Sequence, residues 1–200
     1  RRGAVCAAEK LALVKCRVEA HKDGFGFAVP LTPTGEGDFV LYERQMRGVM
    51  HGDIVTVRPA GIDRRGRREG TVLDVVERAQ SKVVGRFYMD RGVAILEAED
   101  KRLSQSIVLE PESVANFKPQ SGQVIVAEIE TYPEAHRPAV AKLIEVLGDY
   151  ADSGMEIEIA VRKHHLPYQF SEACVKAAKK IPDHVRKTDL KGRVDLRDLP

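Results

Sequence analysis

The sequence predicts a mainly β protein that contains two successive five-stranded barrels and ends in a shorter segment of mixed α+β character. Between residues 11 and 148, short runs rich in β-branched side chains alternate with turns that contain Gly or Asp. Landmarks in the first half of this stretch recur about 70 residues later. Residues 149–200 break the pattern and carry helix signals instead.

The first predicted domain, residues 11–78, contains five expected strands. They occupy residues 11–20, 25–30, 39–42, 54–59 and 70–77. Asp23-Gly24 marks the first turn, and a brief helical or irregular link is expected at residues 43–50. Five short strands joined by tight turns match the size of a small closed barrel. Residues 1–10 precede this domain as an N-terminal lead.

The second predicted domain, residues 79–148, repeats this order. The sequence GDIVTV at residues 52–57 corresponds to GQVIVA at residues 122–127, and residues 71–76 correspond to residues 140–146 with one residue of slack. Two unrelated β-rich stretches are the alternative. A repeat is favoured because the matching stretches occur in the same order and at the same separation along the sequence. The remaining strands are expected at residues 82–89, 93–97 and 105–109.

The third predicted segment, residues 149–200, gives conflicting signals. Residues 153–156 have the spacing of a helix capping box, whereas residues 155–161 alternate between apolar and polar as a strand does. Ser171 is expected to cap a helix, and residues 192–196 suggest a strand. We expect this segment to be too small and irregular to fold alone.

The overall charge is modest and unevenly spread. The 200 residues carry 32 Lys and Arg against 30 Asp and Glu, and this net charge of +2 excludes a histone-like basic tail. In residues 1–78, 79–148 and 149–200, basic and acidic residues number 14 against 11, 8 against 10, and 10 against 9. The basic excess therefore falls in the first 78 residues, where a local nucleic-acid surface is still possible.

The sequence favours a cytoplasmic protein that is part of a longer chain. No apolar run approaches the ~20 residues of a membrane span, and no secretory signal opens the sequence, so we expect no membrane partner. Cys6, Cys16 and Cys174 lack a C-x-x-C spacing, which indicates a reducing compartment and no zinc framework. Because the chain begins at Arg1 and ends at Pro200, we expect it to be a fragment. No catalytic or metal site is predicted within it.

The segment KDGFGF at residues 22–27 is the most informative local pattern. Phe25 and Phe27 are two residues apart, so a strand presents them on one face, and Phe39 on the next strand can extend that face. Stacking of one nucleic-acid base on such a ring stabilises binding by ~1–3 kcal/mol. The alternative is that these phenylalanines belong to the core.

A cationic loop is the second pattern. Arg64, Arg65, Arg67 and Arg68 fall within five positions on an expected hairpin between two strands. Arginine pairs with phosphate in a bidentate manner. The alternative is a solvated loop that contacts nothing. Together with the aromatic face of the same domain, however, the loop favours nucleic acid.

These motifs resemble those of a known family. The segment HKDGFGF at residues 21–27 is similar to the ribonucleoprotein-like motif of cold-shock domains. The whole chain resembles the bacterial ribonuclease II/ribonuclease R family. The matching stretches are MHGD at residues 50–53, DRRGRRE at 63–69, VGR at 84–86, IEVLGD at 144–149 and GRVDLRDLP at 192–200.

The resemblance implies two OB-type cold-shock barrels followed by the opening of a catalytic domain at residues 149–200. Members are processive, hydrolytic 3′→5′ exoribonucleases that depend on Mg²⁺ and release nucleoside 5′-monophosphates. The family's catalytic aspartates follow the stretch that ends at Pro200. Asp195 and Asp198 match the leading motif rather than the metal ligands. The isolated chain is therefore expected to hold no cofactor and to be inactive.

The resemblance also implies single-stranded RNA as the partner of a monomeric chain. We expect Phe25, Phe27 and Phe39 to stack bases. Phosphate contacts are expected from Lys22, Arg64, Arg65, Arg67 and Arg68. The second barrel has RGVA at residues 91–94 in place of the Phe-Gly-Phe motif, so any contacts there would come from Arg86, Phe87 or Arg102. Cold-shock proteins carry a basic residue where this chain has Asp23, and Val18 and Leu41 occupy positions of their Trp and His, which reduces the stacking platform.

Two other classes remain open at this point. One is a stand-alone cold-shock-type nucleic-acid chaperone, against which residues 149–200 argue. The other is an OB-fold module that binds proteins, in which the phenylalanines would be buried. Affinity measurements on variants of the aromatic and arginine residues distinguish the second class from the RNA-binding hypothesis. An Asp-rich continuation after Pro200 would decide for the nuclease against the chaperone.

Overall fold

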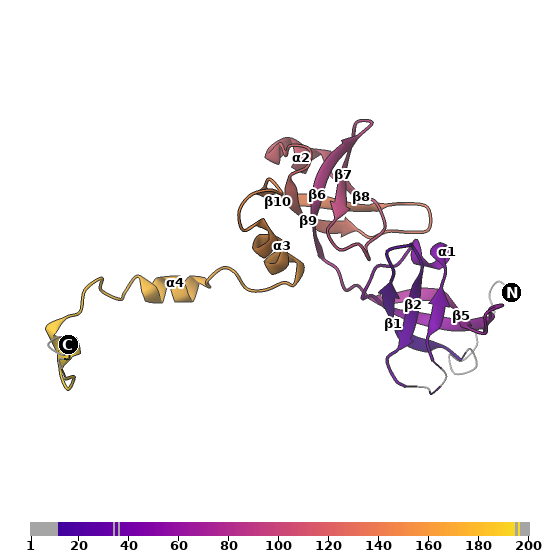
Figure 1. Cartoon of the computed structure of the whole chain (residues 1–200), viewed down its shortest axis with the longest axis horizontal. Helices are drawn as coiled ribbons and strands as arrows, with labels where there is room; N and C mark the ends of the chain where they lie inside the picture. Colours follow the sequence, from indigo (N-terminus) through magenta and orange to yellow (C-terminus); the bar gives the residue numbers. More distant parts are fainter. Residues whose placement is uncertain (1–11, 34, 36, 195, 197–200) are drawn as a thin grey trace. The chain divides into compact units, whose positions relative to one another are not determined.

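Two compact units make up the chain, and each is described by itself. The computed structural model describes residues 12–33, 35, 37–194 and 196, so the N-terminal lead lies outside the described residues. The first unit ends at His164 and contains all of the described strands (Figure 1). The second unit begins at His165 and contains one short α-helix and a 3₁₀ turn.

A closed five-stranded barrel forms the first half of the first unit. Its strands follow the order β1-β2-β3-β5-β4, and β4 pairs with β1 to close the ring. Only the β3–β5 pairing is parallel. The elements are β1 (Val14–Ala20), β2 (Gly26–Pro30), β3 (Phe39–Leu41), α1 (Glu43–Met46), β4 (Ile54–Ile62) and β5 (Arg68–Glu77).

Strand β1 shows why this sequence forms a barrel. Cys16 and Val18 are fully buried, whereas Lys15, Arg17 and Glu19 alternate with them and face solvent. A strand places successive side chains on opposite faces, so this alternation separates the core from the outer surface. Burial raises the pKa of the Cys16 thiol to about 11, which keeps that thiol protonated at neutral pH.

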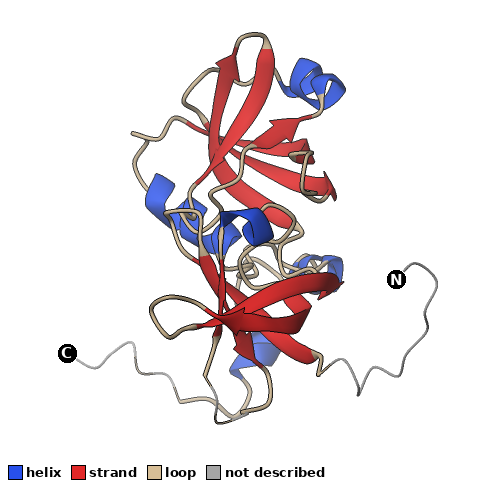
Figure 2. Ribbon diagram, turned by 90° about the vertical axis from the view of Figure 1, so that its right-hand side faces the viewer, coloured by secondary structure: helices blue, strands red, loops and turns tan. Residues whose placement is uncertain are grey.

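The second half of the first unit is a barrel with the same strand order. Reading from β6, its strands follow β6-β7-β8-β10-β9, so β1 corresponds to β6, β4 to β9 and β5 to β10. Figure 2 shows the two barrels as separate groups of strands. The predicted repeat and the five-stranded barrels are confirmed. The elements are β6 (Lys82–Asp90), β7 (Val93–Ala98), β8 (Ile107–Leu109), α2 (Pro111–Phe117), β9 (Val124–Thr131) and β10 (Ala139–Gly148).

A helix, α3 (Met155–Lys163), covers part of the second barrel. Of the two conflicting signals in this segment, the helix signal is therefore confirmed and the strand-like alternation at residues 155–161 is misleading. Met155 and Ile159 lie one helical turn apart, and both are buried in one cluster with three valines. The valines are Val84, Val124 and Val126. The compact unit consequently extends beyond residue 148, where the second domain was expected to end.

The second unit contains α4 (Glu172–Ala178) and a 3₁₀ turn at Lys187–Leu190. The backbone N–H of Cys174 donates to Ser171 Oγ at 3.3 Å, so the expected N-cap is confirmed. The described residues among 192–196 form no strand, contrary to the expectation, and Asp195 and Asp198 lie outside the described residues. Among the helices of the described residues, none has the length and apolar character needed to span a membrane.

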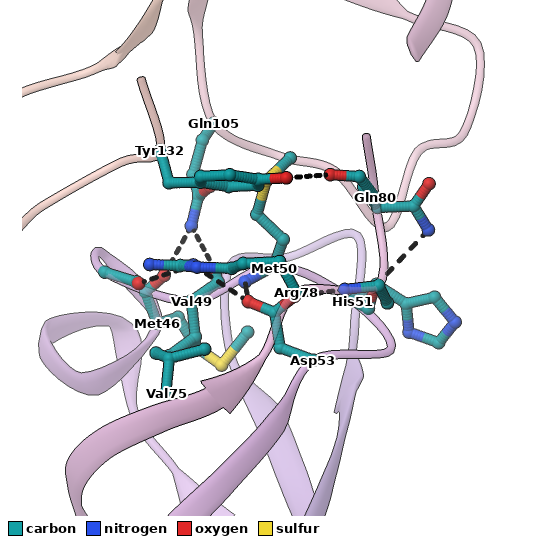
Figure 3. Close-up of polar contacts among 12 residues, drawn as sticks. Met46, Val49, Met50, His51, Asp53, Val75, Arg78, Gln80, Gln105 and Tyr132 are labelled. Atoms are coloured by element: carbon teal, nitrogen blue, oxygen red, sulfur yellow. Dashed lines mark hydrogen bonds and ion pairs between the residues drawn. The ribbon is translucent and has the colours of Figure 1, made fainter. Parts of the chain in front are cut away.

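A buried carboxylate joins the two barrels (Figure 3). The Asp53 side chain is completely buried, and its oxygens accept hydrogen bonds from the backbone N–H groups of Met50 (2.9 Å) and Ala79 (3.0 Å). Arg78 Nη1 donates to Asp53 Oδ2 at 2.9 Å and to the Gly48 carbonyl at 3.1 Å. This network fixes the start of the linker against the first barrel.

Side chains of the second barrel complete this joint. The Arg78 guanidinium carbon lies 4.6 Å from the centroid of the Tyr132 ring, whose hydroxyl donates to the Gln80 carbonyl at 2.9 Å. Gln105 Nε2 donates to the Val49 carbonyl at 2.6 Å and also to the Met46 carbonyl. Met50 belongs to the apolar core of the second barrel, although it precedes strand β4 of the first.

Candidate nucleic-acid interface

A group of aromatic rings lies at the start of β2, and we call it the aromatic cluster. It comprises His21, Phe25 and Phe27. The His21 and Phe25 rings stack with centroids 4.6 Å apart, and Phe25 meets Phe27 edge to face at 5.9 Å. Both phenylalanines are partly exposed. They therefore stand on the outer surface, as the stacking hypothesis requires, and His21 is a member that the sequence reasoning missed.

The turn before β2 holds this cluster in place. The backbone N–H of His21 donates to the Phe25 carbonyl at 2.8 Å, and Gly24 adopts a φ of 85°, which glycine tolerates without strain. A Cβ on Gly26 would lie 2.8 Å from Met46 Sδ and 2.9 Å from the Glu19 carbonyl oxygen, so this position must lack a side chain. Both glycines of the motif thus serve the geometry of the cluster.

Basic residues on β1 continue the surface beyond the aromatic cluster. Glu19 is paired across the strands with Phe27, and Arg17 is paired with Val29. Lys15 and Arg17 are exposed on the same outer face. Sequence reasoning missed both residues, although the alternation of polar and apolar residues in β1 is the signal that places them there. Lys22 is exposed in the adjacent turn.

The expected arginine hairpin connects β4 to β5, and one carboxylate organises it. The Asp63 side chain is only 6% exposed. Its Oδ1 accepts the backbone N–H groups of Arg65 and Arg67 at 2.8 Å each, and its Oδ2 accepts Arg67 Nε at 2.7 Å and the Tyr42 hydroxyl at 3.0 Å. The hydrogen bond from the Arg67 backbone, aided by these partners, holds the pKa of Asp63 well below its usual range.

The four arginines of this loop fall into two pairs. Arg64 and Arg65 are exposed, and within the described part of the chain no hydrogen bond or ion pair of their side chains is seen. Arg67 is bound to Asp63, whereas the Arg68 guanidinium lies 4.2 Å from the Phe39 ring centroid and donates to the Gly37 carbonyl. Arg64 and Arg65 are thus the solvent-exposed pair, whereas Arg67 and Arg68 are engaged within the barrel.

Two of the predicted stacking or contact residues are buried, and these predictions are wrong. Phe39 is completely buried opposite Ala28, in the space that Gly70 leaves by having no side chain. Phe87 is 3% exposed in the core of the second barrel. Neither ring can receive a base because both strands turn these positions inward.

The predicted basic contacts of the second barrel have internal partners. The Arg86 guanidinium carbon lies 3.6 Å from the centroid of the Tyr150 ring. Arg102 donates to Asp100 from Nε at 2.9 Å and from Nη2 at 2.7 Å. This hydrogen bonding holds the pKa of Asp100 at about 2. Both predicted arginines of the second barrel are thus engaged with neighbouring side chains.

Comparisons with known proteins match this architecture. Residues 16–75 match the family described as ribonuclease B OB domain, and residues 95–171 match the family described as cold shock domain. The whole chain is 40% identical to ribonuclease R of Acidithiobacillus ferrooxidans, of which it covers 45%. It is 38% identical over 201 residues to ribonuclease R of Escherichia coli (strain K12), of which it covers 24%.

The whole chain is therefore similar to part of ribonuclease R, and it contains segments that match an OB-domain family and a cold-shock-domain family. It spans less than half the length of these relatives. A solved structure, Mycoplasma genitalium RNase R in complex with ribose-methylated single-stranded RNA, shares the fold with a TM-score of 0.71 at 17% identity; the match covers 84% of this chain and 27% of that one.

The two domain-family matches and the two closed five-stranded barrels confirm the OB-type fold that the sequence predicted. The first match coincides with the first barrel. The cold-shock match begins in β7 and continues through α3, which is consistent with the packing of that helix on the second barrel. In the part of the chain that the structure describes, no three His, Cys, Asp or Glu side chains gather as metal ligands.

Proposed function

We propose that this chain is the RNA-binding region of a ribonuclease R-type 3′→5′ exoribonuclease. It guides single-stranded RNA toward a Mg²⁺-dependent hydrolytic site that lies beyond Pro200. The relatives named ribonuclease R, and the related structure with single-stranded RNA bound, support this proposal. The chain covers less than half of these relatives, and we assign the Mg²⁺-dependent site to the part of them that it does not cover.

The observation that carries the proposal is the partly exposed aromatic cluster on the first barrel, which also carries exposed basic residues. Phe25 and Phe27 present ring surface to solvent, and the exposed Lys22 and Arg64 supply positive charge on the same barrel. Bases stack on aromatic rings without regard to sequence, and cationic side chains follow the backbone. This combination suits a chain that must grip single-stranded RNA of any sequence.

Binding of fluorescently labelled oligouridylate to the 200-residue chain tests this surface. We expect the double variant Phe25→Ala/Phe27→Ala to weaken binding at least about tenfold, because each lost stacking contact costs ~1–3 kcal/mol. The double variant Arg64→Ala/Arg65→Ala should lower the slope of log K against log salt by about 1.4, since each phosphate contact to a single strand contributes about 0.7.

The matched control is Arg91→Ala at the tip of the β6–β7 hairpin. It also removes an exposed arginine, but from the second barrel, where no aromatic cluster adjoins it. It should leave both affinity and salt slope close to wild type. Unchanged affinity in both double variants, with no salt dependence in the wild-type chain, would refute RNA binding by this surface.

We further propose that the isolated chain acts as a cytoplasmic monomer that binds RNA without cutting it. An end-labelled oligonucleotide incubated with nuclease-free chain and Mg²⁺ should keep its length. Stable trimming that follows the chain through purification would contradict the proposal. Sedimentation of the chain alone should give a mass near 22.2 kDa.

A further inference from the structure

The internal repeat allows the outer faces of the two barrels to be compared position by position. In the first barrel, β1 and β4 pair Arg17 with Ile54 and Lys15 with Thr56. In the second barrel, the corresponding strands β6 and β9 pair Arg86 with Val124 and Val84 with Val126. Arg17 therefore occupies the position that Arg86 has in the second barrel.

In the second barrel this face is covered by the chain itself. Met155 and Ile159 of α3 pack against the three valines, and the Tyr150 ring stacks on the Arg86 guanidinium at 3.6 Å. Tyr150 lies just before α3, so the segment that covers the barrel supplies both an apolar anchor and a flat ring over the arginine. An arginine at this position is thus geometrically able to receive an aromatic plane.

In the first barrel the same face carries different residues. Lys15 and Thr56 replace Val84 and Val126, and only Ile54 keeps apolar character. Arg17 is exposed, and among the described residues its side chain shows no hydrogen bond, ion pair or ring contact. A groove of about 610 Å³ adjoins it, lined among others by Lys15, Arg17, Leu31, Ile54, Val76 and Glu77.

We propose that this groove binds one nucleotide of single-stranded RNA, whose base stacks on the Arg17 guanidinium and whose phosphate lies near Lys15. This rests on the proposed function and extends it to a site outside the aromatic cluster. The Tyr150–Arg86 pair of the second barrel is the intramolecular counterpart of this contact. Leu31 and Ile54 offer apolar surface to the edge of the base, and the Glu77 carboxylate can accept hydrogen bonds from amino or hydroxyl groups.

A nucleotide fits this groove better than a protein helix such as α3. A helix would have to bury Lys15 and Thr56 where α3 meets valines, and burial of an unpaired ammonium is strongly unfavourable. A phosphate instead neutralises that charge. The location also favours RNA, because Arg17 is paired with Val29, ~7 Å along the strand from Phe27, within reach of the next nucleotide.

The matched variants Arg17→Lys and Arg86→Lys test the inference in the 200-residue chain. Lysine keeps the charge but lacks the planar guanidinium on which a base stacks. With labelled oligouridylate as the probe, we expect Arg17→Lys to weaken binding about fivefold with an unchanged salt slope. Arg86→Lys should bind as the wild type does, since its position is already covered. Lys15→Ala should lower the salt slope by about 0.7.

An oligouridylate that carries 2-aminopurine at one position provides a second readout. Fluorescence quenching by stacking should decrease in Arg17→Lys and persist in Arg86→Lys. Equal affinity of Arg17→Lys and wild type would overturn the inference, as would an equal loss in Arg86→Lys; a groove that receives a protein helix gives the first of these results. Circular dichroism and thermal unfolding confirm that each variant folds.

Failure of this inference is distinguishable from failure of the proposed function. If only the Arg17 site is wrong, Phe25→Ala/Phe27→Ala still weakens binding while Arg17→Lys does not. If the wild-type chain shows no salt-dependent binding of oligouridylate, the proposed function fails, and the Arg17 site fails with it.

Discussion

The two barrels share one strand order, yet their outer faces differ at several corresponding positions, among them Lys15 and Thr56 against Val84 and Val126. Phe27 in the first barrel and Ile95 in the second occupy corresponding positions, because their pairing partners on β1 and β6 correspond to each other. Where the first barrel leaves Arg17 open, the second places Tyr150 on Arg86. A strand alternates inward and outward side chains, so the outward set can change completely while the core and the fold are retained.

The largest expected effect concerns the joint between the barrels. Asp53→Ala removes the acceptor of two backbone N–H groups, and it leaves Arg78 with the Gly48 carbonyl and the Tyr132 ring but without its counter-ion. We expect a loss of about 3 kcal/mol in the free energy of unfolding, because unsatisfied buried donors and a partly buried charge without its counter-ion are both costly. Urea unfolding followed by circular dichroism measures it.

The control for this variant is Asp23→Ala, which removes an exposed carboxylate from the turn after β1. Its free energy of unfolding should stay within about 0.5 kcal/mol of wild type. A midpoint for Asp53→Ala equal to that of the control would mean that the barrels fold independently of this joint.

A smaller effect tests whether α3 covers the second barrel in solution. Ile159→Ala should destabilise the chain by about 2 kcal/mol, since it removes a side chain that is 8% exposed and packed against valines. Ile157→Ala on the same helix is the matched control, because Ile157 is 68% exposed and should change stability little. Equal losses in thermal unfolding would show that α3 does not pack on this face.

A third prediction tests whether RNA affinity depends on the fixed conformation of the arginine loop or only on its charge. Asp63→Asn makes the chain more positive, so charge alone predicts tighter RNA binding. We expect about threefold weaker binding of oligouridylate instead, because Asn has no second side-chain oxygen to accept hydrogen bonds from Arg67 Nε and the Tyr42 hydroxyl, which hold the loop in place. Asp74→Asn, an equal charge change at an exposed position of β5, should bind as tightly as wild type or slightly more so.

The pH dependence of this prediction has a defined sign. The pKa of Asp63 is lower in the folded chain than its usual value, so its contribution to stability is complete well above pH 4. That contribution falls as the pH drops toward the pKa of the folded state. The stability difference between wild type and Asp63→Asn should therefore be constant from pH 7 to pH 5 and shrink below pH 4. A constant difference at pH 3 and below would contradict the role of the carboxylate.

The smallest expected effect concerns the tip of the second barrel's first hairpin. Arg91 adopts a φ of 48°, followed by Gly92 at 86°, a turn that favours glycine at both positions. Arg91→Gly should raise the free energy of unfolding by about 0.5 kcal/mol and leave RNA affinity unchanged. Arg91→Ala keeps a Cβ in the same conformation and should give no such gain. A loss of RNA affinity in both variants would show that this hairpin is part of the RNA-binding interface.

Much of the fold was predictable because its determinants are local. The alternation in β1, the turn at Gly24 and the recurrence of GDIVTV as GQVIVA each place a strand or a turn without knowledge of the rest. The site was partly predictable for the same reason, since Phe25 and Phe27 and the arginine hairpin are continuous in sequence. In each case the decisive neighbours lie within a few residues.

The missed features depend on partners that are distant in sequence. Met155 and Ile159 fit both a strand and a helix, and only the valine face of the second barrel accounts for their burial on a helix. Phe39 lies in a strand of three residues that are all buried, so no alternation marks its direction. The ring that covers Arg86 comes from Tyr150, beyond the last strand of the barrel.

Met50 links the two barrels in a way that backbone boundaries do not reveal. Its side chain completes the core of the second barrel, although the chain has not yet entered β4 of the first. If the protein were cut between β5 and β6, Met50 would remain in the fragment that contains the first barrel. The core of the second barrel would then have a cavity. Recombination between relatives could therefore exchange the second barrel intact only by also exchanging the loop before β4. For inheritance and for engineering, the indivisible module is the pair of barrels.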